Sequence, residues 1–473
     1  MNTTCFDPVK QCVQKRLQET GIASLAMSIA QNGNILYETG WGWADRANRR
    51  QADAHTMYSL ASISKPITAT ALMILVERGL IDLDKPINDY LGHVKLKAHI
   101  ADAGNATVRR VANHSSGLPL HCHFFYEDEG VNRPHINETL LRYGRLMTPP
   151  GETYQYANSG YGFLEYLIER VSGKSYADFL TQEVFIPLNM PHASVDLPAH
   201  FSPHAAVRYA PNGQPLPGYT FDHPGASAVW ASAHDLVRFG MFHIKAHMID
   251  QRAILSDAAI DAMQKPTVSV SETSGYGVGW RIVENDFGYR TVGHDGSMGG
   301  VRTRLLMVPD ENIAITVLTN AGRHDLPIEI ATEILSVMLP DYAKNRKQHK
   351  PIPVSPAEWT AVPELLGQWT GIVHTYRDEL PVILTAQPDG DLHLKLGDQF
   401  TTLVNNPAFK NDLLTGRFHA DLRDSDAGKH PYHLALHLKL RNGNTLNGPI
   451  HAITTPHNRS GNALSFWTEL KKS

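Results

Sequence analysis

Cysteine is scarce in this chain of 473 residues. Cys5, Cys12 and Cys122 are its three thiols, and they are too few and too unevenly placed for a disulfide framework. No two of them stand in C-x-x-C spacing. A disulfide scaffold and a cysteine-based zinc site are therefore not expected.

An excess of charge of either sign is also missing. The chain has 43 Lys and Arg against 47 Asp and Glu, which gives a formal net charge of -4. So weak an acidic balance gives no electrostatic reason to bind nucleic acid or an anionic membrane. The composition, 42% hydrophobic and 19% charged, is that of an ordinary globular protein.

Long hydrophobic runs do not occur. No stretch approaches the roughly 18 uncharged apolar residues of a membrane-spanning helix. The first residues, MNTTCFDPVKQCVQKRLQET, carry charges every few positions and lack the apolar core of a signal peptide. We therefore expect no membrane span and a cytoplasmic protein, or a periplasmic or secreted one if a signal has been removed.

The length exceeds what one hydrophobic core usually supports, so two domains are expected. Residues 1–343 begin with two strand-like runs around Asn32-Gly33, continue with helical patterns and end with four strands, which predicts an α+β domain. Residues 344–360 are basic and then proline-rich, as in a linker. Residues 361–473 show short alternating runs separated by turns, which predicts a small antiparallel β-barrel.

The segment MYSLASISKPITATALMILVERGL places Ser62 and Lys65 at the start of a predicted apolar helix. A serine hydroxyl needs a positioned base to act as a nucleophile, and residues i and i+3 share one face of a helix. The ordinary alternative is a capping serine followed by a surface lysine. Ser-x-x-Lys alone should arise by chance about once in a chain of this length.

Two later segments offer partners for this pair. YQYANSGYG contains Tyr156-x-Asn158, in which a phenol could relay a proton and an amide could orient a substrate carbonyl or the lysine. TVGHDGSMGG places His294 and Gly296 at the end of a predicted strand, where a glycine would let a substrate lie against the strand edge. Alone, each has an ordinary explanation: a helix cap at Asn158 and a glycine-rich hairpin tip.

The three motifs together resemble the ordered set of the serine β-lactamase and penicillin-binding protein superfamily. The variants are similar to class C β-lactamases, D-alanyl-D-alanine carboxypeptidases, D-aminopeptidases and related esterases, over about residues 10 to 340. The resemblance implies a β-lactamase/transpeptidase-like domain, an antiparallel sheet flanked by helices with a helical subdomain. It makes Ser62 the acylated nucleophile, with Lys65 and Tyr156 sharing proton transfer. It also implies that Asn158 holds the acyl side of the substrate and that the Ser62 and Ser297 amides form an oxyanion hole.

Two features bear on the activity. Efficient class C β-lactamases carry Lys-Thr-Gly where this chain has His294-Asp295-Gly296; a partly charged histidine and an adjacent aspartate disfavour a substrate carboxylate. The segment LLGQWTG, with Gly367 and Trp369, resembles the lipocalin-like barrel of some D-aminopeptidases and penicillin-binding-protein-type peptide cyclases. We expect this barrel to dock against the mouth of the Ser62 site.

The predicted function is a serine hydrolase that forms an acyl-enzyme on Ser62 and cleaves peptide, amide or ester bonds; weak β-lactamase activity is compatible with it. The alternatives are a penicillin-binding-protein-type acyltransferase or peptide macrocyclase and, from another class, a non-catalytic peptide or β-lactam binding protein. The expected partner is a small-molecule or peptide substrate, and the sequence is compatible with a homo-oligomer. No cofactor is expected. No metal is expected either, because His121 and His123 in HCHFF lack a third ligand nearby in the sequence.

Overall fold

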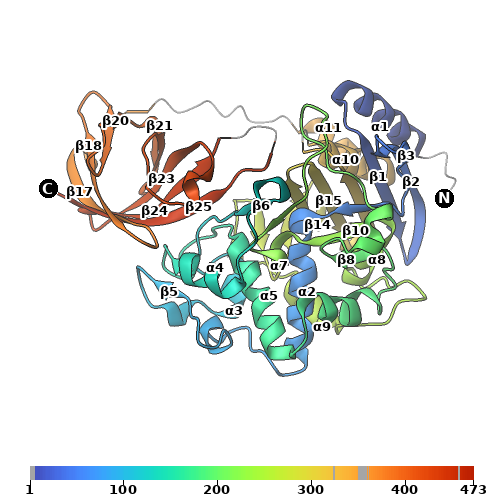
Figure 1. Ribbon diagram of the computed structural model, residues 1–473. Helices are drawn as coiled ribbons and strands as arrows, with labels where there is room; N and C mark the ends of the chain where they lie inside the picture. Colours follow the sequence, from blue (N-terminus) through green and yellow to red (C-terminus); the bar gives the residue numbers. More distant parts are fainter. Residues whose placement is uncertain (1–5, 323–324, 350–358, 361, 456–458) are drawn as a thin grey trace.

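The structure, a computed structural model, describes residues 6–322, 325–349, 359–360, 362–455 and 459–473. It has a mixed helix-and-sheet N-terminal part and an all-β C-terminal part, which lie side by side (Figure 1). Cys5 falls outside the described residues. The helices are α1 Asp7–Thr20, α2 Ser64–Glu77, α3 Val108–Ala112, α4 Ile136–Tyr143, α5 Asn158–Ser172, α6 Tyr176–Leu180, α7 Pro224–Ser227, α8 Ala233–His243, α9 Asp257–Met263, α10 Leu326–Met338 and α11 Pro340–Gln348.

The strands of the N-terminal part are mostly short outside one large sheet. They are β1 Ser24–Gln31, β2 Asn34–Asp45, β3 Arg50–Gln51, β4 Met57–Ser59, β5 Lys97–Ala98, β6 Phe124–Tyr126, β7 Arg145–Leu146, β8 Ala193–Val195, β9 Tyr219–Phe221, β10 Val229–Ser232, β11 Val268–Ser269, β12 Ser274–Tyr276, β13 Arg281–Asp286, β14 Tyr289–Met298, β15 Val301–Val308 and β16 Ile313–Thr319.

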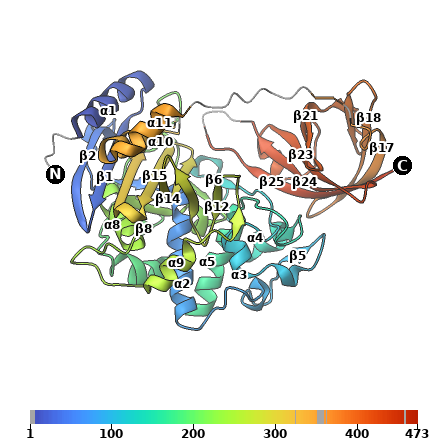
Figure 2. The same cartoon turned by 180° about the vertical axis from the view of Figure 1, so that it is seen from behind.

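The large sheet has nine strands in the order β11-β12-β13-β14-β15-β16-β1-β2-β3. β1 pairs antiparallel with β16, so the sheet joins the two ends of this part of the chain, as the strand pattern predicts. Along β1, Leu25, Met27 and Ile29 pack in one hydrophobic cluster, and Ala26 and Ala30 pack in another. Both faces are therefore buried: α1 and α10 cover one, and α8 covers the other (Figure 2).

The hairpin predicted at Asn32-Gly33 joins β1 to β2. Asn32 and Gly33 have φ angles of 52° and 75°, as a tight two-residue turn between twisted strands requires. The α+β fold class and the antiparallel sheet flanked by helices are confirmed.

Helix α2 runs through the middle of the N-terminal part. Residues 64–75 are all buried, so the helix packs against the protein on every side and not along one stripe. Lys65 is the one charged residue in that buried stretch. No helix among the described residues is both long and apolar enough to span a membrane.

The C-terminal part forms a second nine-stranded antiparallel sheet that nearly closes into a barrel. Its order is β20-β19-β18-β17-β25-β24-β23-β22-β21, so the two edge strands follow each other in the sequence. Alternate residues of β18 point inward and pack with Trp369, which is fully buried. The strands are β17 Gly367–His374, β18 Glu379–Ala386, β19 Leu392–Leu396, β20 Thr402–Leu403, β21 Asn405–Lys410, β22 Leu413–Phe418, β23 Tyr432–Arg441, β24 Thr445–Thr454 and β25 Ala463–Lys472.

The segment between the two parts begins within a helix. The predicted linker starts at residue 344, and helix α11 runs on to Gln348. α11 buries only Tyr342, and Arg346 pairs with Glu333 of α10 at 2.7 Å, so a basic segment with few apolar residues is helical here. Residues 350–358 and 361 lie outside the described residues. The division into 1–343, 344–360 and 361–473 otherwise stays a prediction.

Candidate active site

Ser62 lies in a short 3-10 turn, Ala61–Ile63, that leads directly into α2. The preceding Ala61 has a φ of 49°, a left-handed conformation that is unfavourable for a residue with a Cβ. Such backbone strain persists only where the surroundings enforce it. Here the Leu60 amide donates to the Val229 carbonyl at 2.9 Å, and the Leu60 carbonyl accepts from Thr303 Oγ1 at 2.9 Å.

Gly296 on β14 also helps to hold the backbone at Leu60 and Ala61 in place. A Cβ at this position would lie 2.1 Å from the Leu60 carbonyl oxygen and 2.1 Å from Thr303 Oγ1. A glycine at this position therefore admits the backbone that leads to Ser62. That it also lets a substrate lie against the strand stays a prediction. Gly296 thus helps to position Ser62.

We expect Gly296→Ala to displace Ser62. Overpacking of this kind costs about 1–3 kcal/mol of stability, and a shift of the nucleophile by about 1 Å can cost about 10²-fold in rate. Thermal unfolding should show the first effect, and kcat/KM for an activated ester the second. Gly428→Ala is the control, because a Cβ there meets nothing within 4 Å. If Gly296→Ala matches wild type in both measurements, the packing argument is wrong.

Lys65 lies on the same face as Ser62, as the i, i+3 spacing predicts. Its Nζ donates to Ser62 Oγ at 3.0 Å, to Asn158 Oδ1 at 2.7 Å and to the Ala226 carbonyl at 3.3 Å. Among the residues that the structure describes, no carboxylate pairs with this ammonium, and the side chain is fully buried. Burial lowers the pKa of Lys65 to about 7, so a substantial fraction is neutral and able to accept a proton at neutral pH.

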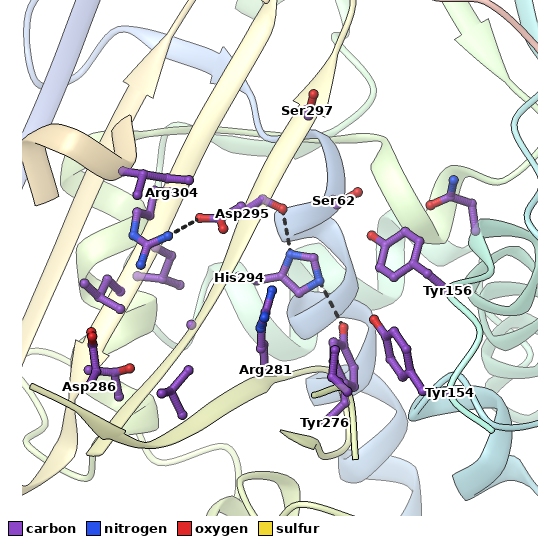
Figure 3. Close-up of a pocket in the computed structure, with 18 of the residues that line it drawn as sticks. Ser62, Tyr154, Tyr156, Tyr276, Arg281, Asp286, His294, Asp295, Ser297 and Arg304 are labelled. Carbon is purple, nitrogen blue, oxygen red and sulfur yellow. Dashed lines mark hydrogen bonds and ion pairs between the residues drawn. The ribbon is translucent and has the colours of Figure 1, made fainter. Parts of the chain in front are cut away.

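Tyr156 lies beside Ser62, with its hydroxyl pointing toward the serine (Figure 3). Its ring centroid is 4.6 Å from Lys65 Nζ. Burial raises the pKa of Tyr156 well above its usual value. The tyrosine therefore stays protonated at neutral pH and is suited to donate or relay a proton.

Asn158 is the first residue of α5 and does not cap it, because the N-cap position is Ala157. Besides accepting from Lys65, its side chain donates from Nδ2 to the His121 carbonyl at 2.9 Å. Of the two roles considered from the sequence, these contacts favour orienting the lysine. Ser64, the neighbour of Lys65, accepts from the Val229 amide at 3.0 Å and so makes a local structural contact.

His294 is buried and held by two hydrogen bonds. Its Nδ1 is 2.7 Å from the Asp295 carbonyl, which can only accept, and its Nε2 is 2.9 Å from the Tyr276 hydroxyl. Burial, with the nearby Lys65, lowers the pKa of His294 to about 4. The expectation of a partly charged histidine is thus corrected to a neutral one.

Asp295 also differs from expectation. Its carboxylate pairs with Arg304 Nη1 at 2.8 Å and points away from Ser62 (Figure 3). The arginine offsets the negative charge that was expected to repel a substrate carboxylate. The expectation of a weak affinity for anionic substrates therefore rests on the neutral His294 and not on Asp295.

His114 is a member of the site that the sequence reasoning passed over as part of a turn. Its ring packs against Tyr156, with 4.4 Å between centroids, and against Tyr276 at 4.9 Å. Its Nδ1 accepts from the Ala157 amide at 3.2 Å, which fixes the backbone between Tyr156 and Asn158. The lone signal in the sequence is a histidine within a turn cluster, too common to single it out.

Part of this site lines a cavity of about 760 Å³. Ser62, Tyr156, Asn158, His294 and Ser297 all line it, so the fold brings together residues from all three sequence motifs. Gly296 is not among the lining residues. A second cavity of about 1100 Å³ is lined by Tyr154 and Tyr156 and by barrel residues such as Arg441. The barrel therefore borders the Ser62 site.

Comparisons with known proteins fit this geometry. The sequence model of the family described as Beta-lactamase matches residues 9–337, well over half of the chain. The chain belongs to the Beta-lactamase family. Penicillin-binding protein 4* of Bacillus subtilis (strain 168) is 26% identical over 322 residues, covering 62% of this chain and 66% of that protein. Penicillin-binding protein 4 of Amycolatopsis lactamdurans is 27% identical over 369 residues, covering 72% and 93%. The match thus spans slightly less than two thirds of the Bacillus protein.

Solved structures share the fold. The octameric penicillin-binding protein homologue from Pyrococcus abyssi superimposes with a TM-score of 0.63 at 22% identity, over the full length of both chains. SurE with D-Leu gives a TM-score of 0.62 at 19% identity, also over both full chains. A class C β-lactamase from Rhodobacter sphaeroides gives 0.59 at 21% identity, covering 70% of this chain and 99% of the other. Membership of this Beta-lactamase family supports serine acyl-enzyme chemistry.

Proposed function

We propose that the protein is a serine hydrolase that forms an acyl-enzyme on Ser62 and cleaves amide or ester bonds of peptide-like substrates. The observation that carries this proposal is the contact of 3.0 Å between Lys65 Nζ and Ser62 Oγ, in a site where burial lowers the pKa of the lysine to about 7. A non-catalytic binding protein would have no need of a desolvated lysine beside a serine that a strained Ala61 holds in place.

The reaction follows from the proton positions. Neutral Lys65 accepts the proton of Ser62 as Oγ attacks the substrate carbonyl carbon, and the amides of Ser62 and Ser297 would stabilise the oxyanion. Protonated Tyr156 then donates to the leaving amine or alkoxide as the bond to carbon breaks, and takes its proton back through Lys65. Water, activated by the same pair, hydrolyses the ester on Ser62.

The surroundings favour peptides and esters over β-lactams. Neutral His294 provides no fixed positive charge for a carboxylate, which leaves Arg281 as the cation beside it in the cavity. The cavity beside the barrel offers room for a longer chain. We therefore expect peptidase, D-aminopeptidase or carboxylesterase activity, with weak β-lactam hydrolysis at most. An acyltransferase or macrocyclase would use the same acyl-enzyme with an amine in place of water, and no contact favours it.

Covalent labelling tests whether Ser62 is the nucleophile. Intact mass spectrometry with a fluorophosphonate should show one adduct, and peptide mapping should place it on Ser62. A panel of D-amino-acid amides, p-nitrophenyl esters and nitrocefin then defines the substrate class. Ser297→Ala is the matched control, because it removes a hydroxyl from the same cavity but keeps the backbone amide. An adduct on another residue, or full labelling of Ser62→Ala, would contradict the proposal.

The activity should depend on pH through Lys65. The base must be neutral, so kcat/KM for an uncharged ester should rise with pH and reach half its plateau near pH 7. At pH 5.5 it should be about 30-fold below the plateau, since about 3% of a group with that pKa is then neutral. His294, with a pKa of about 4, does not titrate in this range. Circular dichroism across the range controls for unfolding, and a flat profile between pH 5.5 and 8.5 would exclude Lys65 as the base.

The homo-oligomer stays a proposal. Its support is the octameric assembly of the Pyrococcus abyssi homologue, whose likeness to this chain shows a common fold. Light scattering coupled to gel filtration measures the assembly state directly.

A further inference from the structure

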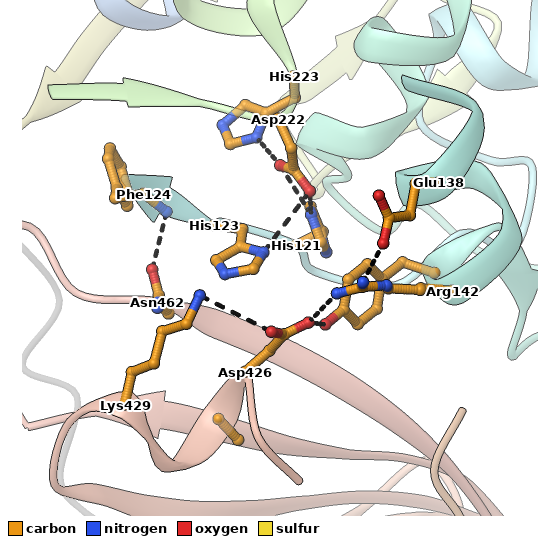
Figure 4. Close-up of polar contacts among 12 residues, drawn as sticks. His121, His123, Phe124, Glu138, Arg142, Asp222, His223, Asp426, Lys429 and Asn462 are labelled. Atoms are coloured by element: carbon orange, nitrogen blue, oxygen red, sulfur yellow. Dashed lines mark hydrogen bonds and ion pairs between the residues drawn. The ribbon is translucent and has the colours of Figure 1, made fainter. Parts of the chain in front are cut away.

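Three histidines and one aspartate form a buried cluster where the N-terminal part meets the barrel (Figure 4). His121 and His123 lie just before β6. Asp222 and His223 lie between β9 and α7. Their side chains are at most 2% exposed. The sequence offered no third ligand for His121 and His123, but the fold brings two from about 100 residues away.

The Asp222 carboxylate is the centre of the cluster. Its oxygens lie 2.9 and 3.0 Å from His121 Nε2, and one of them lies 2.8 Å from His223 Nδ1. Two imidazole N–H groups would satisfy this carboxylate by hydrogen bonding alone. Those two contacts therefore do not by themselves require a further ligand.

His123 is not accounted for by such hydrogen bonding. Its Nδ1 lies 3.8 Å from Asp222 Oδ2, too far for a hydrogen bond, and neither of its buried ring nitrogens has a hydrogen-bond partner. A buried imidazole without partners loses its hydration and gains nothing in return. Its ring faces the carboxylate, in the position of an additional ligand (Figure 4).

We propose that His121, His123, Asp222 and His223 bind one Zn²⁺ ion. Zn–N bonds of about 2.0–2.1 Å and Zn–O bonds of about 2.0–2.2 Å place tetrahedral ligand atoms about 3.3 Å apart. The nitrogen–oxygen separations of 2.8 to 3.8 Å lie on both sides of this value. Ligand atoms of His121, Asp222 and His223 already lie within 4.8 Å of one another. His123, whose Nδ1 is 3.8 Å from Asp222 Oδ2, would have to move its ring to complete the set.

The ligands indicate the kind of metal and its role. Three imidazoles with one carboxylate suit Zn²⁺, whereas Mg²⁺ and Ca²⁺ prefer sites made of oxygen. Four protein ligands in a buried site leave no position for substrate, so the ion would be structural. His121 also accepts the hydrogen bond from Asn158, and Cys122 pairs with Ala463 of the barrel. The ion would thereby fix the loop that supports Asn158 and pairs with the barrel.

A second group of possible ligands provides the control. Glu38, His55 and His234 also lie within 4.8 Å of one another, but their side chains are 23 to 50% exposed. His234→Gln removes one of these surface ligands without touching the buried cluster. Metal binding is therefore measured in full-length protein that carries His234→Gln.

The experiment strips this protein with a chelator, adds Zn²⁺, removes excess by gel filtration and measures zinc by elemental mass spectrometry. We expect one zinc per chain, a higher melting temperature with Zn²⁺ but not with Mg²⁺, and the intense visible absorption of four-coordinate Co²⁺ when cobalt replaces zinc. Less than 0.1 zinc per chain, or the weak spectrum of six-coordinate Co²⁺, would overturn the proposal.

Two further variants locate the ion. Asp222→Asn keeps the size of the side chain but loses the charged ligand, and should reduce the bound zinc below 0.1 per chain. His123→Phe keeps an aromatic ring and leaves the His121 and His223 contacts to Asp222 intact, so it should fold even if Asp222→Asn does not. It should weaken zinc binding at least 100-fold. Zinc binding that is unchanged in a folded variant of either kind would place the ion elsewhere and overturn the assignment.

Discussion

Replacing Lys65 by methionine should lower kcat/KM for a small ester by about 10³-fold while the protein stays folded. Loss of a positioned general base costs about 10² to 10⁴-fold. Stability should change by less than about 2 kcal/mol, because two effects oppose each other. Methionine removes the cost of burying an ammonium, but the Asn158 Oδ1 loses its 2.7 Å hydrogen bond. Steady-state kinetics measures the loss of kcat/KM, and thermal unfolding measures the change in stability.

Lys65→Arg distinguishes a base from a fixed positive charge. A guanidinium keeps its proton at neutral pH, so arginine cannot accept the proton of Ser62. If Lys65 is the base, the arginine and methionine variants should be similarly inactive. If it acts only by its charge, arginine should retain most of the activity. Lys174→Met, at an exposed lysine that pairs with Glu183, should leave kcat/KM unchanged.

The motifs that could be predicted are those whose geometry is local. Ser62 and Lys65 are three residues apart on one helix, so their contact follows from helix geometry. Placing Tyr156 and His294 in the same cavity depended on the family resemblance, because no local pattern brings residues so distant in sequence together. The barrel could be predicted from alternation, since its inward side chains follow the period of a strand.

What could not be predicted depends on contacts between distant segments. Nothing near His294 in the sequence shows that Tyr276 would bond it, or that burial would leave it neutral. The role of Gly296 depends on how closely β14 approaches Leu60. The sequence of α11 has the composition of a linker, and its helix is supported by packing on α10 that composition does not reveal.

The contact between the N-terminal part and the barrel was expected, but not the residues that make it. Asp426 of the barrel is largely buried and accepts from Tyr143 Oη at 2.7 Å and from Arg142 Nη1 at 2.8 Å, both on α4. Tyr143 itself packs in the hydrophobic cluster of the barrel. The two parts therefore share a core residue and a partly buried ion pair, which should make them unfold together.

Asp426→Ala should lower the free energy of unfolding by about 2–4 kcal/mol. Removing one partner of a buried ion pair costs about 3–5 kcal/mol, and Arg142 recovers part of this because it also contacts Glu138 and is partly exposed. The Tyr143 hydroxyl, however, is left without its acceptor. Urea unfolding followed by intrinsic fluorescence measures the change.

The control is a surface ion pair in the same barrel. Asp398 pairs with Arg423, and their side chains are 78% and 51% exposed, so Asp398→Ala should cost less than about 1 kcal/mol. A double-mutant cycle with Tyr143→Phe isolates the contribution of the contact itself, because adjacent residues that share a hydrogen bond do not act additively. If Asp426→Ala costs no more than Asp398→Ala, the contact does not hold the barrel in place. The barrel would then be held by the Cys122–Ala463 pairing and its neighbours, and a mobile barrel could no longer provide a fixed wall for the substrate cavity.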